Sequence, residues 1–250
     1  MPEPLRGAYV ERLSVAPVKS LAMQHPDAIA LGPLGVHEDR RFFLVDDQGR
    51  LVNGVRHGTL VRARAAFDGA QLRIDLPDGE RVAGAIELGA PVAVEWQVGF
   101  SVRGRIVEGP FAQALSKFAG FAVQLACADE ARAAWSWHPA SLVGSASIAS
   151  LRAEGLDPRR FRMLVEIAGA EPFEEDGWIG HSVRVGEAVV AVRAPCKRCV
   201  TTNRDPVSGI TDSNTMRALF EQRGRVELGI YGDVERPGTV RLGDRVQPLC

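Results

Sequence analysis

The chain has 250 residues and a mass of 27.0 kDa, which allows one large domain or two small ones with a sizeable core. Hydrophobic residues make up 46% and charged residues 24% of it, and these proportions exclude a disordered or fibrous protein. The formal net charge of -1 leaves no basic excess to neutralise a phosphate backbone, so we expect no nucleic-acid partner.

The N-terminal residues lack the apolar core of a signal peptide, and no stretch approaches the roughly 18 uncharged apolar residues of a bilayer span. We therefore expect a soluble, cytoplasmic protein without a membrane span. Four cysteines are too few for a disulfide scaffold in a chain of this length, so we expect their thiols to be available for metal or redox chemistry.

Alternating apolar residues are the main secondary-structure signal. In chain order, residues 72–76 alternate and run into a Pro-Asp-Gly turn, and residues 92–102 alternate over their whole length. A period of two is typical of half-buried strands, so we predict a strand at each place, the second long and continuous. Shorter alternations predict strands at 183–185 and 240–242.

Helical spacing of apolar residues is confined to three short segments, 111–118, 148–154 and 215–223. The last segment is preceded by Ser213 and Asn214, either of which suits an N-cap, and a glycine follows it as a typical stop signal. We predict one short helix at each segment.

Frequent short strands separated by Gly and Pro turns are typical of barrels and sandwiches. We therefore predict a mainly β protein with a few short helices, an α+β fold, built as two β-barrel-like domains. The boundary is expected near residue 118, where the first predicted helix ends, which gives domains of residues 1–118 and 119–250.

Lys19 and Ser20 form the first segment of chemical interest, and Arg40 follows later in the chain. An ammonium, a hydroxyl and a guanidinium supply charge-assisted donors of different geometry, and such groups hold a phosphate. Two alternatives stay open: a solvated strand edge for Lys19 and Ser20, and an ion pair between Arg40 and Asp39.

Cys196 and Cys199 enclose two cations, Lys197 and Arg198. Neighbouring cations favour the thiolate, which is both the nucleophile and the metal ligand. The spacing alone leaves four possibilities open: a structural zinc site, a thioredoxin-like dithiol, two cysteines packed in a loop, and a thiolate ligand to a metal carried by a cofactor.

Several segments resemble two known domains. Cys199, the two threonines and the Asp-Pro that follow it, and the glycine at 209 resemble the signature of the MOSC domain, the molybdenum cofactor sulfurase C-terminal domain. Residues 17–20 and 39–42 resemble the β-barrel domain that precedes MOSC in the mitochondrial amidoxime-reducing component family and its bacterial relatives. Further matches follow in order at 107–110, 160–162, 176–180 and 237–246.

The resemblance implies a molybdenum site in which one cysteine thiolate binds the metal and a pterin dithiolene supplies two more sulfurs. Matched by position, the metal ligand and catalytic residue is Cys199, and Cys196 is its neighbour. The positions that contact the cofactor, Mo-molybdopterin, fall on Lys19, Ser20, Arg40, Arg162, Arg198 and Tyr231. The cations among them suit an anionic metal complex that carries a phosphate.

The function implied by the resemblance is a two-electron reduction of small N-hydroxylated compounds from N–OH to N–H. We expect the electrons to come from a separate donor protein of the ferredoxin or flavoprotein type. The proton source stays open between water, Asp205 and His138. Met163 and Leu164 stand where the family often has Pro-Asn, which supports one alternative, a cofactor or sulfur carrier without this turnover. The pair Cys196 and Cys199 keeps a second alternative open, a Cys-x-x-Cys thiol redox protein.

Overall fold

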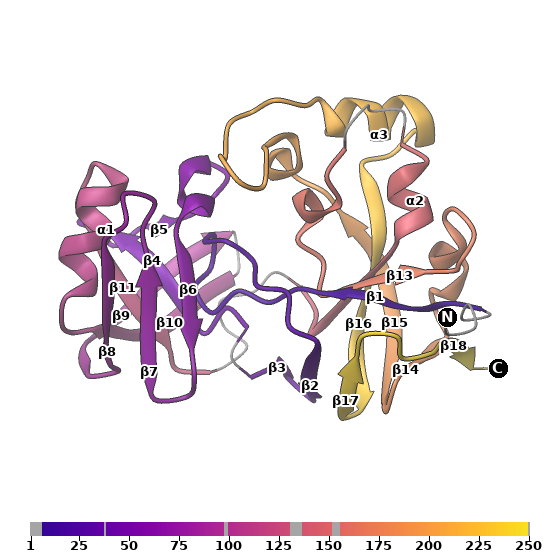
Figure 1. Ribbon diagram of the computed structural model, residues 1–250, viewed down its shortest axis with the longest axis horizontal. Coiled ribbons are helices and arrows are strands. Elements are labelled where there is room, and N and C mark those ends of the chain that lie inside the picture. The colour runs from indigo at the N-terminus through magenta and orange to yellow at the C-terminus, as the bar shows by residue number, and fades with distance from the viewer. Residues whose placement is uncertain (1–6, 38, 98–99, 131–136, 152–155, 250) are drawn as a thin grey trace.

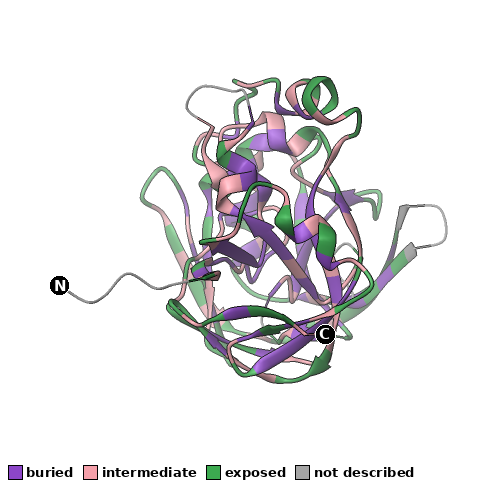
Figure 2. Cartoon of the chain, turned by 90° about the vertical axis from the view of Figure 1, so that its right-hand side faces the viewer, coloured by how far each residue is buried: buried purple, intermediate pink, exposed green. Residues whose placement is uncertain are grey.

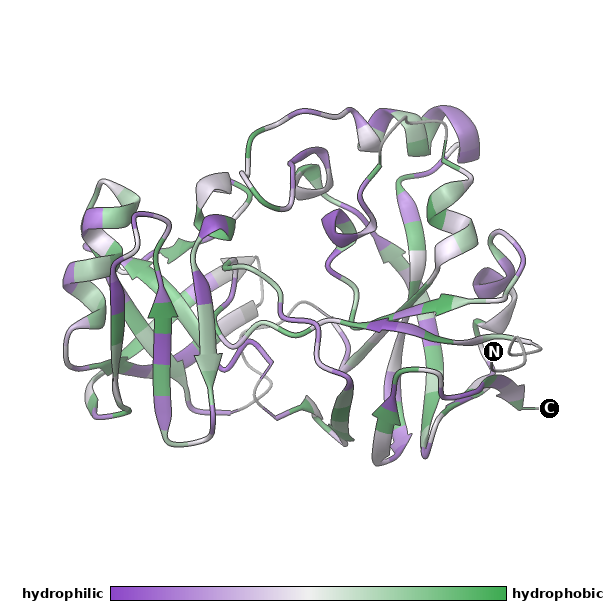
Figure 3. Cartoon of the chain, in the orientation of Figure 1, coloured by the Kyte–Doolittle hydropathy of each residue, from purple (hydrophilic) through white to green (hydrophobic). Residues whose placement is uncertain are grey.

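The computed structural model describes residues 7–37, 39–97, 100–130, 137–151 and 156–249, which form two lobes (Figure 1). Strands account for 44% of the structure, and the described residues form three α-helices. The predicted mainly β fold with a few short helices is therefore confirmed. Figure 3 shows hydrophobic and hydrophilic residues alternating along several strands, as the sequence pattern requires.

The C-terminal lobe, on the right in Figure 1, contains a seven-stranded sheet. Its strands are β1 (Tyr9–Leu13), β12 (Ala140–Gly144), β13 (Val165–Ala168), β14 (Ser182–Val185), β15 (Ala188–Lys197), β16 (Glu227–Arg236) and β18 (Val246–Leu249). They follow the order β1-β13-β12-β16-β15-β14-β18. The Val10 amide donates to the Asp244 carbonyl at 2.8 Å, and the Val246 amide donates to the Ala8 carbonyl at 2.9 Å. These bonds join the two edges, so the sheet forms a nearly closed barrel.

A three-stranded sheet, β17-β2-β3, adjoins this barrel. Its strands are β2 (Ala28–Gly32), β3 (Gly35–Val36) and β17 (Gly238–Arg241). Ile29 and Leu31 from β2 are buried in the same core as Leu142 and Ile230 of the barrel. Figure 2 shows how the buried residues follow the strands of this lobe.

The N-terminal lobe, on the left in Figure 1, packs a five-stranded and a three-stranded sheet around one core. The larger sheet has the strands β4 (Phe42–Asp46), β5 (Leu51–Val52), β9 (Leu88–Gln97), β10 (Phe100–Val107) and β11 (Val123–Ala128). The smaller has β6 (Arg64–Phe67), β7 (Gln71–Asp75) and β8 (Arg81–Ala85). Phe42, Leu72 and Phe111 are buried between them.

The two lobes do not follow the chain in simple succession. β1 pairs with β13 over 150 residues later, with Tyr9 opposite Ala168, so the first described strand belongs to the C-terminal lobe. β11, which follows residue 118, pairs with β4 and β10 of the N-terminal lobe. These pairings leave the domain boundary near residue 118 untested, so it stays a prediction.

The prediction of one continuous strand over residues 92–102 is wrong. The segment contains the end of β9 and the start of β10, which form an antiparallel pair with Phe100 opposite Gln97 and Val102 opposite Val94. Cross-strand partners face the same side of a sheet, so the apolar alternation continues from one strand to the next. Residues 98–99, between the two strands, lie outside the described residues.

Two predicted helices are confirmed and one is displaced. α1 (Phe111–Ala119) and α3 (Thr215–Arg223) occupy the predicted segments, and Asn214 is the N-cap of α3. α2 (Ser145–Ala149) begins before the predicted start at residue 148. The buried Glu175 carboxylate explains the shift, because it accepts hydrogen bonds at this turn from Gly144 N and Ser147 Oγ at 3.1 and 2.7 Å. Of the predicted 148–154, residues 152–155 lie outside the described residues.

The other predicted strands agree with the structure to within a residue or two. β7 and β14 cover the alternations at 72–76 and 183–185, while β17 ends at Arg241, so Leu242 lies beyond it and is exposed. The described part of the chain also contains four 3-10 turns: η1 (Gly58–Arg62), η2 (Pro158–Phe161), η3 (Glu174–Trp178) and η4 (Val200–Asn203). Within the described residues, none of the helices has the length and apolar character needed to cross a membrane.

Candidate functional site

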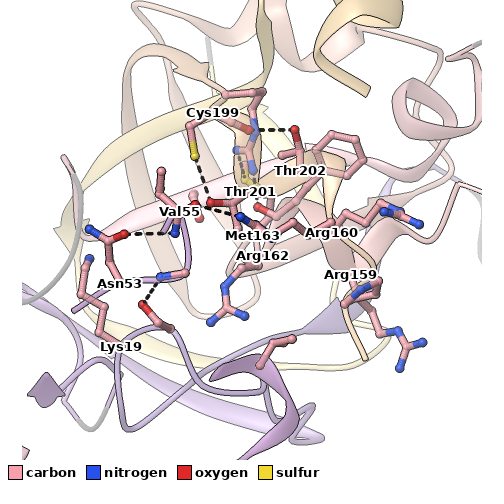
Figure 4. Close-up of a pocket in the computed structure, with 18 of the residues that line it drawn as sticks. Lys19, Asn53, Val55, Arg159, Arg160, Arg162, Met163, Cys199, Thr201 and Thr202 are labelled. Atoms are coloured by element: carbon pink, nitrogen blue, oxygen red, sulfur yellow. Dashed lines mark hydrogen bonds between the residues drawn. The ribbon is translucent and has the colours of Figure 1, made fainter. Parts of the chain in front are cut away.

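A cavity of about 570 Å³ is lined by residues of both lobes (Figure 4). The N-terminal lobe contributes the segment around Asn53, and the C-terminal lobe contributes η2, η4 and the chain around them. Residues 19–20 and 39–40, which lie on the connections between the lobes, form another part of the wall.

All seven residues predicted to form the site line this one cavity. They are Lys19, Ser20, Arg40, Arg162, Arg198, Cys199 and Tyr231. The structure thus brings together side chains that are up to 212 positions apart in the sequence, from Lys19 to Tyr231. Their roles in binding a cofactor stay predictions.

Lys19, Arg40 and Arg162 form what we call the cationic wall of the cavity. Arg40 and Arg162 have φ values of 53° and 52°, and Ser20 beside Lys19 has a φ of 75°. Phe173 is the other described non-glycine residue with a positive φ. Left-handed backbone at a non-glycine residue costs on the order of 1 kcal/mol, and such strain gathers at functional sites.

Specific hydrogen bonds hold the cationic wall in place. The Arg40 amide donates to the Ala16 carbonyl at 2.6 Å, and the Arg40 guanidinium pairs with Asp39. Asp39 in turn accepts from the Ala16 amide at 2.7 Å. The Arg162 guanidinium donates to the Leu21 carbonyl at 2.8 Å. The ion pair between Asp39 and Arg40, which the sequence left open, is confirmed. Arg40 lines the cavity even though it forms this pair.

The cations of this wall repel one another. Burial, together with the charges of Arg40 and Arg162, lowers the pKa of Lys19 to about 7. Burial and the Arg40 charge lower the pKa of Arg162 to about 10. An anion placed among these groups would raise both pKa values by favouring the charged forms, so this part of the cavity is suited to bind negative charge.

Cys199 lies on the segment that we call the thiol loop, residues 196–209. It is exposed, it is the N-cap residue of η4, and its Sγ lies 3.3 Å from Thr201 Oγ1. The Thr202 hydroxyl donates to the Cys199 carbonyl at 2.9 Å and fixes this turn. The thiol is therefore accessible from the cavity in a defined backbone conformation (Figure 4).

Cys196 has a different environment. It is fully buried and packs with Met163, Leu219 and other apolar residues. Arg198 donates to Cys196 Sγ at 2.6 Å and to Met163 Sδ at 3.0 Å, and its guanidinium lies 5.4 Å from the centre of the Phe161 ring. Arg198 therefore directs most of its donors into the protein. One thiol in the core and one in the cavity do not suit a dithiol that is oxidised and reduced as a pair.

The sequence analysis missed the loop of residues 53–58. The Gly54 amide donates to Ser20 Oγ at 3.0 Å, and the Val55 amide donates to Asn53 Oδ1 at 3.0 Å. Arg204 of the thiol loop donates to the Val55 carbonyl at 2.9 Å. Asn-Gly is a strong turn signal and could have marked this loop, but nothing local indicates that it faces the cavity.

The two side chains left open as proton sources both line the cavity. Asp205 Oδ1 accepts from the Ser208 amide at 2.6 Å and the Ser208 hydroxyl at 2.7 Å. These bonds hold the pKa of Asp205 below its usual value and make it a turn-forming residue. His138 lies 2.9 Å through Nδ1 from Asp233 Oδ1.

Comparison with known protein families shows to which family this chain belongs. The MOSC N-terminal beta barrel domain matches residues 7–118, and the MOSC domain matches residues 134–247. The chain is a MOSC-domain protein with a MOSC N-terminal barrel. The signature residues around Cys199 fall within the second match and Lys19, Ser20 and Arg40 within the first.

The MOSC protein is also similar to curated relatives along its whole length. It is 25% identical over 279 residues to mitochondrial amidoxime-reducing component 1 of Xenopus laevis, and the alignment covers 95% of this chain and 81% of that protein. It is 23% identical to the Danio rerio protein of the same name, which covers 98% of this chain and 86% of that protein. Among solved structures, the YuaD protein of Bacillus subtilis is similar with a TM-score of 0.47 and 13% identity, covering 96% and 93% of the two chains.

MOSC domains are associated with binding of the molybdenum cofactor, and the cavity of this MOSC protein fits such a group. Among the described residues, no three His, Cys, Asp or Glu side chains are grouped to hold a metal ion. A metal at Cys199 would therefore take its other ligands from the cofactor. The cationic wall suits the cofactor's phosphate, and the exposed thiol suits a metal that prefers sulfur.

Proposed function

We propose that this MOSC protein is a cytoplasmic, molybdenum-cofactor-dependent oxidoreductase that reduces small N-hydroxylated compounds. The observation that carries the proposal is the placement of an accessible Cys199 thiol and the cationic wall in one cavity. The names of the relatives, amidoxime-reducing components, support this reaction class. The electrons would come from a separate donor protein of the ferredoxin or flavoprotein type.

The residues of the cavity would divide the work of binding. Lys19, Ser20 and Arg40, with Arg162, would hold the phosphate and the pterin by charge-assisted hydrogen bonds. Cys199 would bind the metal, and Arg198 and Tyr231 would support the wall behind it. When bound, the cofactor supplies two-electron redox chemistry at a sulfur-ligated metal.

The proposed reaction balances without another reactant. The substrate R–N–OH takes up two electrons and two protons, its N–O bond breaks, and R–N–H and one water are released. The protein would position the substrate hydroxyl at the cofactor and supply protons. The donor protein renews the two electrons after each turnover.

The direct test is the molybdenum content of protein purified from a host that makes the cofactor. We expect close to one metal per chain in the wild type and almost none in Cys199→Ala, since the variant lacks the metal ligand. Cys196→Ala is the matched control, because Cys196 belongs to the core, and its metal content should follow the wild type. Equal loss in both variants would show that Cys199 is not the specific ligand, and absence of molybdenum in the wild type would overturn the proposal.

A carrier of the cofactor is the second candidate, and Leu164 favours it. Leu164 stands where the family often has an asparagine, and it is a buried apolar residue of the cavity lining, so no amide side chain reaches the cavity at this position. A carrier would contain stoichiometric molybdenum and would show no turnover of benzamidoxime with an artificial electron donor. Turnover by the metal-loaded wild type excludes this candidate.

A further inference from the structure

The proposed reduction consumes two protons, and the cavity wall holds one histidine whose surroundings suit proton transfer. We propose that His138 is the general acid of this site and that Asp233 holds its ring in the reactive orientation. This inference rests on the proposed function.

His138 lies directly before β12, and its partner lies on β16, the strand paired with β12. Ala140 is opposite Gly232 in this pairing, so the sheet register brings His138 beside Asp233. His138 Nδ1 lies 2.9 Å from Asp233 Oδ1. The backbone of two paired strands therefore fixes the position of the pair.

The chemistry of the partner fixes the tautomer. The hydrogen bond from His138 and the one from Arg193 hold the pKa of Asp233 below its usual value, so the carboxylate is ionised at neutral pH. An ionised carboxylate only accepts hydrogen bonds, so the proton between the two groups belongs to His138 Nδ1. Nε2 is then the ring atom that gains and loses a proton, and His138 lines the cavity.

The pair connects the cavity with solvent. The His138 side chain is 25% exposed, and the Asp233 side chain beside it is 45% exposed. Arg193 on β15 donates to the other Asp233 oxygen at 2.9 Å. Asp233 is thus anchored from two sides and holds the His138 ring in one orientation. Solvent at the mouth of the cavity can return a proton to the ring after each transfer.

The groups that face His138 from neighbouring elements do not compete for the role. Tyr231 of β16 has its ring centre 5.9 Å from the His138 ring, and burial raises the pKa of its hydroxyl, so it is a poor proton donor. Asp205 accepts three hydrogen bonds from its own turn and stays ionised. Cys199 is assigned to the metal. Of these cavity-lining side chains, His138 is therefore the one left to act as the proton donor.

The proposed step transfers one proton from His138 Nε2 to the hydroxyl oxygen of the substrate as the N–O bond breaks. The two electrons would be supplied by the donor protein through the bound cofactor. The second proton comes from water and ends on the substrate nitrogen. The neutral imidazole keeps its proton on Nδ1, which donates it in the hydrogen bond to Asp233, and Nε2 regains a proton from solvent, so atoms and charge balance.

The test compares His138→Gln with the wild type and with His181→Gln, a matched control because His181 is exposed and does not line the cavity. Each is loaded with cofactor and assayed for kcat on benzamidoxime with an artificial electron donor from pH 5 to 9. We expect His138→Gln to lose about 100-fold in kcat, the lower range for general acid catalysis, with unchanged molybdenum content. His181→Gln should match the wild type.

Asp233→Asn gives a second, independent readout. Removing the carboxylate destabilises the imidazolium, so the decline of kcat with rising pH should begin about one pH unit lower than in the wild type. In cofactor-free protein, ¹⁵N NMR of the imidazole should show the proton of the neutral ring on Nδ1. A neutral ring protonated on Nε2 would contradict the Asp233 assignment.

The outcomes separate the two proposals. A metal-loaded wild type without turnover overturns the proposed function and this inference with it. Turnover in the wild type, with His138→Gln within twofold of it over the whole pH range, overturns the role of His138 alone. Loss of molybdenum from His138→Gln would show that the residue supports cofactor binding instead of proton transfer.

Discussion

The cationic wall and the thiol loop meet in one cavity, yet they are built by opposite means. The wall consists of partly buried cations, two of them on left-handed backbone, and burial together with their mutual repulsion lowers the pKa values of Lys19 and Arg162. In the thiol loop, Cys199 is exposed on a turn that a hydrogen bond from the Thr202 hydroxyl fixes. The comparison indicates that the cationic wall destabilises the fold until an anion binds to it. The thiol loop, by contrast, exposes the Cys199 thiol with little loss of folding free energy.

The thiol loop depends on one close contact with the N-terminal lobe. Gly209 has a φ of 75°, and a Cβ there would overlap the Gly58 carbonyl group. The two glycines let the backbones of the two lobes touch at the cavity.

The largest expected effect therefore comes from Gly209→Ala, which should separate the loop from the lobe. We expect a loss of about 3 kcal/mol in the free energy of unfolding, or roughly 6–12 °C in Tm for a chain of this size. Gly224→Ala is the matched control, since Gly224 has a φ of 67° and open space around it. Both variants carry the backbone strain of a positive φ, so the difference between their Tm values in thermal denaturation measures the effect of the contact alone. Equal Tm values for the two variants would show that the contact contributes nothing.

The cationic wall can be tested by removing the charge of Lys19, whose pKa is shifted far from its usual value. Lys19 has a folded pKa of about 7 against 10.5 in the unfolded chain, so the unfolded state binds more protons between these values and stability rises with pH in that window. Lys19→Met removes this penalty, and we expect the cofactor-free variant to gain about 2 kcal/mol at pH 7 by denaturant unfolding.

Lys117→Met is the matched control for this experiment. Lys117 is exposed and pairs with Glu80 at the surface at 2.6 Å, so the substitution should change stability by less than about 0.5 kcal/mol. The cofactor-free Lys19→Met protein should be the more stable of the two and should bind less cofactor. A destabilised Lys19→Met would show that the charge is already compensated within the protein.

Anion binding to the cationic wall should depend on pH because Lys19 changes its charge near neutral pH. Sulfate, which stays dianionic, needs protonated Lys19, and the fraction that is protonated falls as pH rises through about 7. Linkage then weakens the affinity about fivefold between pH 7 and 8, measured by calorimetry on cofactor-free protein. Lys19→Met should bind sulfate weakly and with no dependence over this interval, whereas an unchanged slope would assign the titration to another group.

The comparison also shows what the sequence can predict. The alternation of apolar residues predicted a mainly β fold because the period of two is a local property. The seven cavity residues were predicted through their resemblance to a family, and the structure brings them together. The left-handed backbone of Ser20 and Arg40 left no signal, since neither residue type favours it.

Contacts between distant residues account for the rest of what was missed. His138 and Asp233 are 95 positions apart, and only the pairing of β12 with β16 reveals that they meet. β9 and β10 were predicted as one strand because the alternation has the same period in both of these paired strands. In both cases the missing information is tertiary pairing, which local periodicity does not contain.

The smallest effect is expected at Ser20, which links the wall to the loop of residues 53–58. Its hydroxyl oxygen accepts from the Gly54 amide at 3.0 Å, while its left-handed backbone turns the chain beside Lys19. Ser20→Ala removes one neutral hydrogen bond, so we expect a loss of about 1 kcal/mol in stability and an up to tenfold weaker affinity for sulfate. Ser20→Gly removes the same hydroxyl but relieves the positive φ, and it should therefore be the more stable of the two variants. If Ser20→Gly is the less stable in denaturant unfolding, the strain assigned to this position is absent and the wall is held by side-chain contacts alone.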